Sequence, residues 1–289
     1  ESVGGQELSG DNAVQRFLAI NAGGGRVLLR NSSSLEVTEI TQVDGGDVEI
    51  ANSGDVEIAG VVSTTGQVTV EADGKIVETA AGRIDAAALS ASSTGGQMLL
   101  GDNHIHSFAA YNDGGDIQLN NTSDELNVGS IVQASGGSIE VANSGGGITF
   151  TGLVQTDESV SLTAQGVIGQ VGDGRFADVV SLTIESTGGL DLSGDNTVRR
   201  FQAVNAGGGR VALNNTAPEG LEIIQVLQTD GGEIELTSAG GVTIADEIKS
   251  AGGDISIAAG GSIRSAHGDV AIQGKDINLA ADQGGIVAP

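Results

Sequence analysis

The chain has no cysteine, no tryptophan and only two prolines among its 289 residues. Without cysteine, neither a disulfide framework nor a thiolate metal site can form. Aromatic residues make up 2% of the chain, which excludes a core built on bulky rings. Glycine is abundant, with 48 residues, but the scarcity of proline excludes collagen and a proline-rich disordered linker. These absences favour a regular, glycine-punctuated structure built from aliphatic residues.

Basic side chains are also scarce. The 12 lysines and arginines stand against 38 aspartates and glutamates, which gives a formal net charge of −26. This charge disfavours nucleic acid or an anionic membrane as a partner and predicts a solvated surface. No apolar run reaches about 18 residues, so we expect no membrane insertion by this segment. Glu1 opens the sequence without a charged and then apolar leader, which is typical of a mature product or an excised fragment.

Three similar segments follow one another along the chain, and each contains a Gly-Gly pair and a Gly-Asp-Asn triplet. The triplets lie at residues 10–12, 101–103 and 194–196. The copies begin 91 and 93 residues apart, at Gly4, Gly95 and Gly188. Similarity at a fixed period indicates a repeat architecture. We therefore expect three tandem repeats, at residues 4–94, 95–187 and 188–289.

A shorter period runs inside each copy, in which a Gly-Gly or similar turn precedes a strand of alternating apolar and polar residues. Successive turns lie roughly 19 to 23 residues apart, as in one coil of a β-solenoid. Alternation predicts an inward set in residues 45–58, namely Val48, Ile50, Val56 and Ile58. The outward set there is Asp47, Glu49 and Glu57. The sequence thus predicts an all-β fold, a right-handed parallel β-helix of about 20 residues per coil, continuous as a single domain over residues 1–289.

Two segments carry a family resemblance: residues 192–213, LSGDNTVRRFQAVNAGGGRVAL, and residues 252–263, GGDISIAAGGSI. They resemble the repeat regions of filamentous-haemagglutinin-like exoproteins, which are giant bacterial adhesins exported by two-partner secretion or as autotransporters. The resemblance covers nearly the whole chain, although the family's Asn-Pro-Asn-Leu-type secretion motif is absent from it. It implies a parallel β-helix that is secreted or on the bacterial cell surface and serves as a non-catalytic structural or adhesive rod. Its partners would be extracellular protein or glycan receptors, or other copies of itself in filaments.

Two alternatives to a structural rod stay open. The first is an extracellular glycan- or calcium-binding module. The second is a β-helical carbohydrate-active enzyme, which would need a pair of carboxylates at a defined separation, or carboxylates combined with lysine or arginine. Here the basic residues are scattered, and the carboxylates are spread evenly along outward strand positions. We therefore expect no catalytic residue, no enzyme activity and no cofactor apart from calcium.

The calcium candidates are the aspartates of the three triplets, Asp11, Asp102 and Asp195. Aspartate and asparagine oxygens in glycine-rich turns suit calcium. However, the spacing matches neither an EF-hand loop nor the nonapeptide calcium repeat. Such residues more often bond their own backbone in turns, so turn chemistry is the favoured interpretation.

Two histidines form a second candidate metal site. His104 and His106 are two residues apart, which would place both rings on one face of a strand, close to Asp102. The other copies hold Ala13 and Gln15, and Thr197 and Arg199, at the equivalent positions. An exposed pair without a metal is therefore favoured.

Phenylalanine recurs at one position of the repeat, at Phe17, Phe108 and Phe201. Exposed rings there would suit sugar stacking. Their regular recurrence fits an internal stacked ladder better, so we expect these rings in the core.

Overall fold

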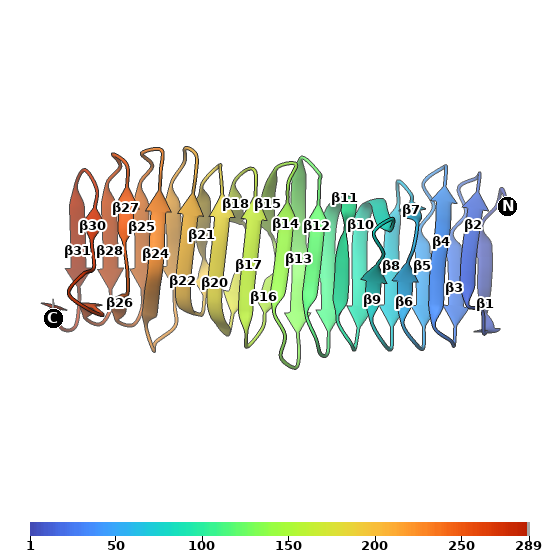
Figure 1. Cartoon of the computed structure of the whole chain (residues 1–289), viewed down its shortest axis with the longest axis horizontal. Helices are drawn as coiled ribbons and strands as arrows, with labels where there is room; N and C mark the ends of the chain where they lie inside the picture. The colour runs from blue at the N-terminus through green and yellow to red at the C-terminus, as the bar shows by residue number, and fades with distance from the viewer. Residues whose placement is uncertain (288–289) are drawn as a thin grey trace. The chain divides into compact units, whose positions relative to one another are not determined.

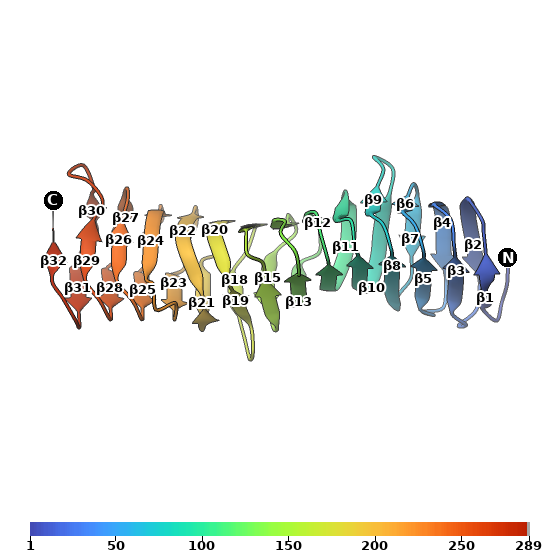
Figure 2. The same cartoon turned by 90° about the horizontal axis from the view of Figure 1, so that it is seen from below.

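The computed structural model describes residues 1–287, which form 32 β-strands and, over that range, no helix. The strands pair in parallel, each with strands about one turn earlier and one turn later in the sequence. The chain winds in this way into a β-solenoid of about 13 turns with about 21 residues per turn (Figure 1, Figure 2). The predicted all-β, parallel β-helical fold is confirmed.

The chain divides into two compact units, Glu1–Ser144 and Gly145–Pro289. The strands of the first unit are β1 Gln6–Asn12, β2 Arg16–Asn21, β3 Val27–Asn31, β4 Leu35–Gln42, β5 Val48–Asn52, β6 Val56–Ile58, β7 Val61–Ser63, β8 Gln67–Ala72, β9 Ile76–Glu78, β10 Arg83–Ser93, β11 Gln97–Asn112, β12 Ile117–Asn121, β13 Glu125–Gln133 and β14 Ile139–Asn143. The strands of the second unit are β15 Gly147–Phe150, β16 Leu153–Gln155, β17 Ser159–Ala164, β18 Ile168–Gln170, β19 Arg175–Ala177, β20 Val179–Ser186, β21 Leu190–Asn196, β22 Val198–Asn205, β23 Val211–Asn215, β24 Leu221–Gln228, β25 Ile234–Ser238, β26 Val242–Ile244, β27 Ile248–Ser250, β28 Ile255–Ala259, β29 Ile263–Ser265, β30 Ile272–Gln273, β31 Ile277–Ala281 and β32 Ile286–Val287.

The core of the first unit consists of columns of aliphatic side chains, with one residue from each turn. In one column Val27 pairs with Val48, Val48 with Val68, and Val68 with Leu89. All four side chains are buried. Burying a side chain of this size contributes about 1.5–3 kcal/mol. Each added turn repeats the same contacts, so stability accumulates along the unit.

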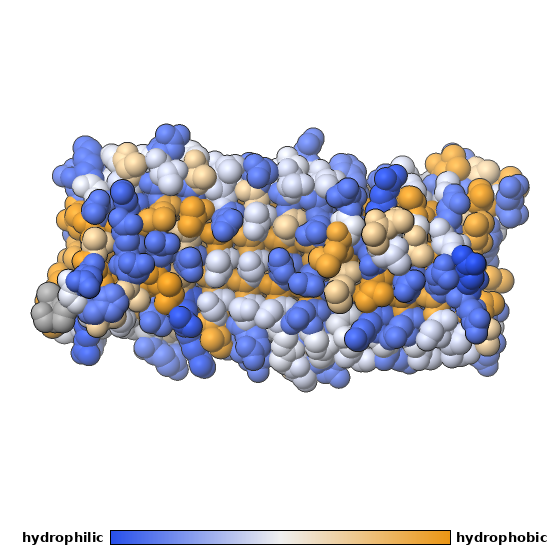
Figure 3. Space-filling model, in the orientation of Figure 1, coloured by the Kyte–Doolittle hydropathy of each residue, from blue (hydrophilic) through white to orange (hydrophobic). Residues whose placement is uncertain are grey.

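The predicted alternation of inward and outward residues is confirmed in β5 and β6. The inward residues Val48, Ile50, Val56 and Ile58 are buried. Among the outward residues, Asp47 and Glu57 are exposed and Glu49 is half-buried. Figure 3 shows the result on one face of the molecule, where hydrophilic side chains are interspersed with smaller apolar areas.

The second unit has an equivalent core column. Leu190 pairs with Val211, Val211 with Ile234, and Ile234 with Ile255, and all four are buried. Two rings also meet edge to face in this unit, since the centroids of Phe150 and Phe176 lie 5.0 Å apart. These few buried aromatics supplement a core that is otherwise aliphatic.

Buried polar side chains close the corners of the turns in both units. In the first unit, Ser93 Oγ donates to Asn112 Oδ1 at 2.7 Å, and Asn112 Nδ2 donates to Gln133 Oε1 at 2.9 Å. Asn112 Oδ1 also accepts from the backbone N–H of Gly96 at 3.0 Å. In the second unit the same arrangement recurs with Ser186, Asn205, Gln228 and Gly189. Buried polar groups must be hydrogen-bonded. At these corners the side chains supply the hydrogen bonds that water would otherwise have to provide.

The long repeat is not a whole number of turns. At about 21 residues per turn, the 91 residues between Gly4 and Gly95 span about four and a third turns. Gln6 therefore lies in the column of Val27, whereas its equivalent, Gln97, lies in the column of Ile76. The first two copies thus present their triplets on different sides of the first unit.

Candidate functional site

The second Gly-Asp-Asn triplet forms a bulge within β11. The register of β11 against β12 shifts between Leu99 and Asn103, which takes the triplet out of the regular ladder. The Asn103 side chain is buried and turns back into the bulge. Its Nδ2 lies 3.3 Å from the carbonyl oxygen of Leu99 and 3.2 Å from that of Gly101, and its Oδ1 accepts from the Ile84 N–H at 2.7 Å. The expected turn chemistry is confirmed for the asparagine of this triplet.

Glu78, at the end of β9, contacts the same bulge from the preceding turn. Its Oε2 accepts hydrogen bonds from the Gly101 N–H at 2.7 Å and from Asn103 Nδ2 at 3.1 Å. Its Oε1 is buried and has no hydrogen-bond partner within residues 1–287. Burial raises the pKa of the Glu78 carboxyl above its usual value, and the two hydrogen bonds oppose this shift without cancelling it.

In the third copy a glutamine takes the place of this glutamate. Gln170, at the end of β18, accepts from the Gly194 N–H at 3.0 Å and from Asn196 Nδ2 at 3.1 Å through Oε1. Unlike Glu78, it also donates from Nε2 to Asn196 Oδ1 at 2.7 Å. That Oδ1 in turn accepts from the Phe176 N–H at 2.9 Å. Both polar ends of the Gln170 amide are therefore satisfied.

The first copy keeps only part of this network. Asn12 Nδ2 lies 3.0 Å from the carbonyl oxygens of Leu8 and Gly10 and 2.9 Å from that of Arg30. Asn12 itself is half-buried. Within the described range 1–287, no glutamate or glutamine side chain bonds to this bulge. The bulge is thus held by its own bonds, by the bond to Arg30 and by two bonds that Ser32 donates to the Asn12 carbonyl oxygen from its N–H and its hydroxyl.

The aspartates of the triplets lie on the outside of these bulges. Asp11, Asp102 and Asp195 are all exposed. Over the described part of the chain, no three His, Cys, Asp or Glu side chains come together in a way that could hold a metal ion. Calcium binding at these positions stays a prediction from the sequence.

The two histidines project from the outer face of β11. Their ring centroids lie 5.2 Å apart at an interplanar angle of 75°, and both side chains are exposed. The prediction that His104 and His106 share one exposed face of a strand is confirmed. Two imidazoles alone make an incomplete ligand set for a protein zinc site, which uses at least three.

The recurring phenylalanines lie in the core, as expected. Phe17, Phe108 and Phe201 are all buried. Each ring stacks on aliphatic neighbours, as Phe17 does on Val37 and Phe108 on Leu89. The expected stacked ladder of these rings is wrong for the first unit, because Phe17 and Phe108 lie 91 residues, or about four and a third turns, apart and aliphatic residues occupy the turns between them.

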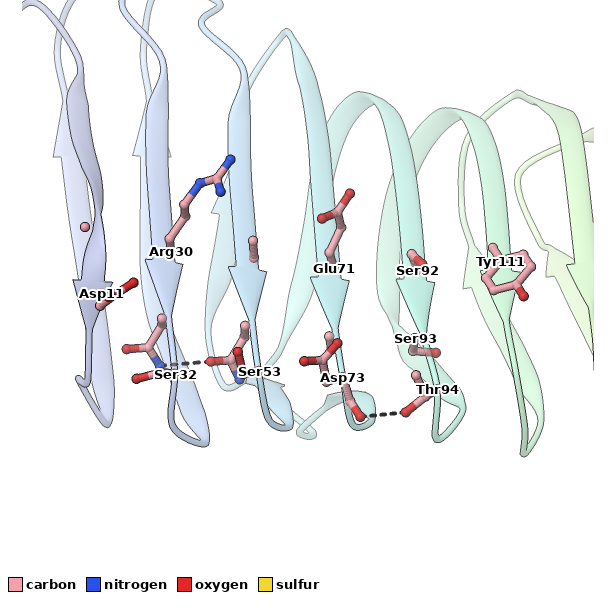
Figure 4. Close-up of a pocket in the computed structure, with 15 residues that line it drawn as sticks. Asp11, Arg30, Ser32, Ser53, Glu71, Asp73, Ser92, Ser93, Thr94 and Tyr111 are labelled. Carbon is pink, nitrogen blue, oxygen red and sulfur yellow. Dashed lines mark hydrogen bonds between the residues drawn. The ribbon is translucent and has the colours of Figure 1, made fainter.

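A shallow, open groove of about 530 Å³ crosses one side of the first unit (Figure 4). It runs over β1, β3, β5, β8, β10 and β11, so it follows the direction in which the turns stack. One row of outward side chains along it consists of direct register partners, in the order Arg30, Ala51, Glu71, Ser92 and Tyr111. Long and short side chains alternate in this row, which leaves a gap over Ala51 and another over Ser92.

A second row of polar side chains lines the groove just beyond the strand ends. Figure 4 shows Ser32, Ser53, Asp73 and Thr94 in this row, on four successive turns. Thr94 Oγ1 donates to the carbonyl oxygen of Asp73 at 2.5 Å. Hydroxyl and carboxylate groups thus face the groove along its whole length.

Sequence reasoning missed this groove. Its residues lie 19 to 21 positions apart, at Arg30, Ala51, Glu71, Ser92 and Tyr111. Because turn lengths vary by one or two residues, the sequence alone does not show which outward residues become neighbours. Aligning the turns on their glycine pairs is the signal that could have suggested the row.

No protein family, curated protein or solved structure matches this chain. Of the resemblance to filamentous-haemagglutinin-like proteins, the structure supports the β-helical repeat fold. A helix with the length and apolar character to cross a membrane is not found in residues 1–287.

Proposed function

We propose that this chain is a non-catalytic structural or adhesive segment of a large secreted or cell-surface bacterial protein of the filamentous-haemagglutinin-like kind. The proposal is based on the hydrogen bonds that buried polar side chains form between neighbouring turns. In both units, buried serine, asparagine and glutamine side chains bond to the equivalent positions of neighbouring turns. Residue types that serve catalysis elsewhere serve here to join one turn to the next.

The physical properties of such a segment suit a stalk. Each turn adds a nearly identical interface, so a solenoid extends without needing a larger core. The outward carboxylates and the net charge of −26 keep its long surface solvated and discourage lateral aggregation. Single arginines bridge the carboxylates of turns on both sides, as Arg26 does with Glu7 and Glu49.

Labelling of intact cells tests the location and the role together. An antibody raised against this chain should label unbroken cells of the source organism, and electron microscopy should place the label on an elongated surface structure. Labelling that appears only after cell lysis would contradict the proposal.

The enzyme alternative is tested separately. The purified chain is incubated with neutral and acidic polysaccharides, and reducing ends and unsaturated uronic acid products are measured. We expect no turnover above that of a heat-denatured sample. Product release that is lost when a single carboxylate is substituted would favour the enzyme.

A further inference from the structure

The groove on the first unit has the spacing and chemistry of a binding site for an extended chain. Successive turns lie about 4.8 Å apart, so the four turns from Arg30 to Tyr111 extend over about 19 Å. The gaps over Ala51 and Ser92 lie two turns apart, between the long side chains of Arg30, Glu71 and Tyr111. The site is therefore a row of alternating ridges and gaps rather than one enclosed pocket.

The two charged residues of this row are available to a ligand. Arg16 on β2 and Arg26, which directly precedes β3, form ion pairs with Glu36 and Glu7 at 3.1 and 2.9 Å. In contrast, neither the Arg30 guanidinium nor the Glu71 carboxylate forms an ion pair or a side-chain hydrogen bond with any of residues 1–287. Both residues line the groove, and Figure 4 shows their side chains extending from their strands away from the row of Ser32, Ser53, Asp73 and Thr94. Arg30 offers only donors and Glu71 only acceptors, so together they suit a ligand that carries both kinds of group.

Tyr111 supplies the apolar contact at one end of the row. It is the one tyrosine of the chain, and 48% of its surface is exposed. An aromatic ring presents a flat apolar face together with a polar tip. The C–H face of a sugar ring is also flat and apolar while its edge carries hydroxyls, so the two surfaces match.

An extended peptide fits the groove less well. Peptides that bind to sheets add a strand at a free edge, but β3, β5, β8 and β10 are already paired on both sides. A polyanion also fits poorly, because Asp11, Glu71 and Asp73 all line the groove and would repel it. A neutral chain rich in hydroxyls avoids both difficulties.

We propose that this groove binds a neutral oligosaccharide lying across successive turns of the first unit. One sugar ring stacks on Tyr111, and others occupy the gaps over Ser92 and Ala51. Glu71 accepts hydrogen bonds from ring hydroxyls, and Arg30 donates to ring and hydroxyl oxygens. The site rests on the adhesive part of the proposed function and specifies its ligand class, whereas the structural part does not depend on it.

Calorimetric titration of the full chain tests the site with three neutral probes: cellohexaose, laminarihexaose and mannohexaose. We expect at least one of them to bind saturably, with one site per chain. Tyr111→Ala and Glu71→Ala should each weaken that binding about tenfold or more, because the first removes the stacking ring and the second removes the carboxylate acceptors. Ala51→Gln should also weaken it, because the longer side chain fills a gap. The matched controls Met98→Ala, on the same strand as Tyr111, and Glu57→Gln should leave the affinity unchanged.

Several results would overturn the proposal. One is the absence of saturable binding of all three hexasaccharides at millimolar concentration. Another is binding that Tyr111→Ala leaves intact in a variant whose melting curve matches that of the unmodified chain. Tighter binding of a heparin hexasaccharide or of an oligolysine peptide at the groove would assign it to a different ligand class. None of these outcomes bears on the cell-surface labelling that tests the structural role.

Discussion

The second and third Gly-Asp-Asn bulges share one backbone design and differ in one side chain. In the second, Glu78 accepts from a glycine N–H and from the amide of Asn103. In the third, Gln170 makes the same two contacts and adds a bond to Asn196 Oδ1. The glutamate oxygen that corresponds to the donating amide nitrogen of Gln170 is buried without a partner.

The difference shows what the bulge requires of its neighbour. It needs an acceptor at one side-chain atom and a donor at the other. A glutamine supplies both, and a glutamate does so only when it is protonated, because an ionised carboxylate has no hydrogen to donate. When Glu78 is protonated, it can therefore make the same hydrogen bonds as Gln170. When Glu78 is ionised, it lacks the donor that Gln170 provides.

The first bulge shows that the Gly-Asp-Asn sequence alone does not determine how deeply its asparagine is buried or how much space surrounds its glycine. Asn12 is half-buried, whereas Asn103 and Asn196 are fully buried. A Cβ added at Gly10 would meet nothing within 4 Å, whereas at Gly101 it would lie 2.1 Å from a backbone oxygen. The three Gly-Asp-Asn triplets are identical in sequence. They nevertheless differ in how closely the neighbouring turn packs against them.

The largest effect is expected from removing the asparagine side chain. Asn103→Ala and Asn196→Ala should each lower the free energy of unfolding by about 3–5 kcal/mol, because several buried backbone groups lose their partners at once. Asn12→Ala should cost only about 1 kcal/mol, since water can reach that bulge. Denaturant titration measures all three. Equal losses at the three positions would mean that the neighbouring turn does not matter.

A smaller effect is expected from the glycines of the same triplets. In Gly101→Ala and Gly194→Ala, the new Cβ would lie 2.1 and 2.2 Å from the carbonyl oxygens of Gly82 and Gly174. The backbone must shift to relieve this contact, which costs about 2–3 kcal/mol. Gly10→Ala has open space and should change stability by about 0.5 kcal/mol or less. Thermal melting compares the variants, and a large loss at Gly10 would refute the argument.

Much of the fold could be predicted from the sequence because its determinants are local. The alternation in residues 45–58 identifies the buried faces, and the glycine pairs mark where the chain turns. Gly96 and Gly189, for example, both adopt a φ of 107°, which other residues rarely do. The burial of Phe108 also followed from its position in the repeat.

The candidate sites could not be predicted in this way, because they depend on which turns become neighbours. Glu78 lies 25 residues from Asn103, and Gln170 lies 26 residues from Asn196, so no fixed spacing connects them. The alternation in β9 places Glu78 on the inward face, two residues from the buried Ile76 and in register with the buried Ile58 of the preceding turn. A charged residue at an inward position is thus a signal that the sequence does contain, but the sequence does not show that the Gly101 and Asn103 bulge of the next turn supplies its hydrogen bonds.

Exchanging glutamate and glutamine between positions 78 and 170 tests the comparison of the second and third bulges directly. Gln170→Glu replaces a donor by a second acceptor 2.7 Å from Asn196 Oδ1, inside the core. At pH 7 we expect a loss of about 2 kcal/mol in the free energy of unfolding, since a buried charge is left without its partner. The loss should shrink as the pH falls and the new carboxyl becomes protonated. A loss that is independent of pH would point to packing rather than to charge.

The reverse exchange should produce a small gain. Glu78→Gln should raise the free energy of unfolding by about 1 kcal/mol at pH 7, because the new amide can donate to Asn103 Oδ1 as Gln170 does to Asn196. Urea titration at several pH values measures the gain. The matched control is Glu57→Gln on the neighbouring β6, where the carboxylate is exposed and the change should have little effect.

The pH dependence of this gain is the sharper test. The charged residues on the strands next to Glu78 are Glu57 on β6, Arg83 and Asp85 on β10, and Asp102 on β11, and the raised pKa of Glu78 arises from burial rather than from these charges. Because the folded state holds the proton more tightly, the neutral carboxyl favours folding. Below a pH of about 4, the group is protonated in both states and the unmodified chain keeps this stability in full. As the pH rises through the folded pKa, that stability is lost, while the glutamine variant loses nothing. The two unfolding free energies should therefore nearly coincide at low pH and diverge toward neutrality, and an advantage for the glutamine variant that persists unchanged at low pH would contradict the assignment of Glu78 as the titrating group.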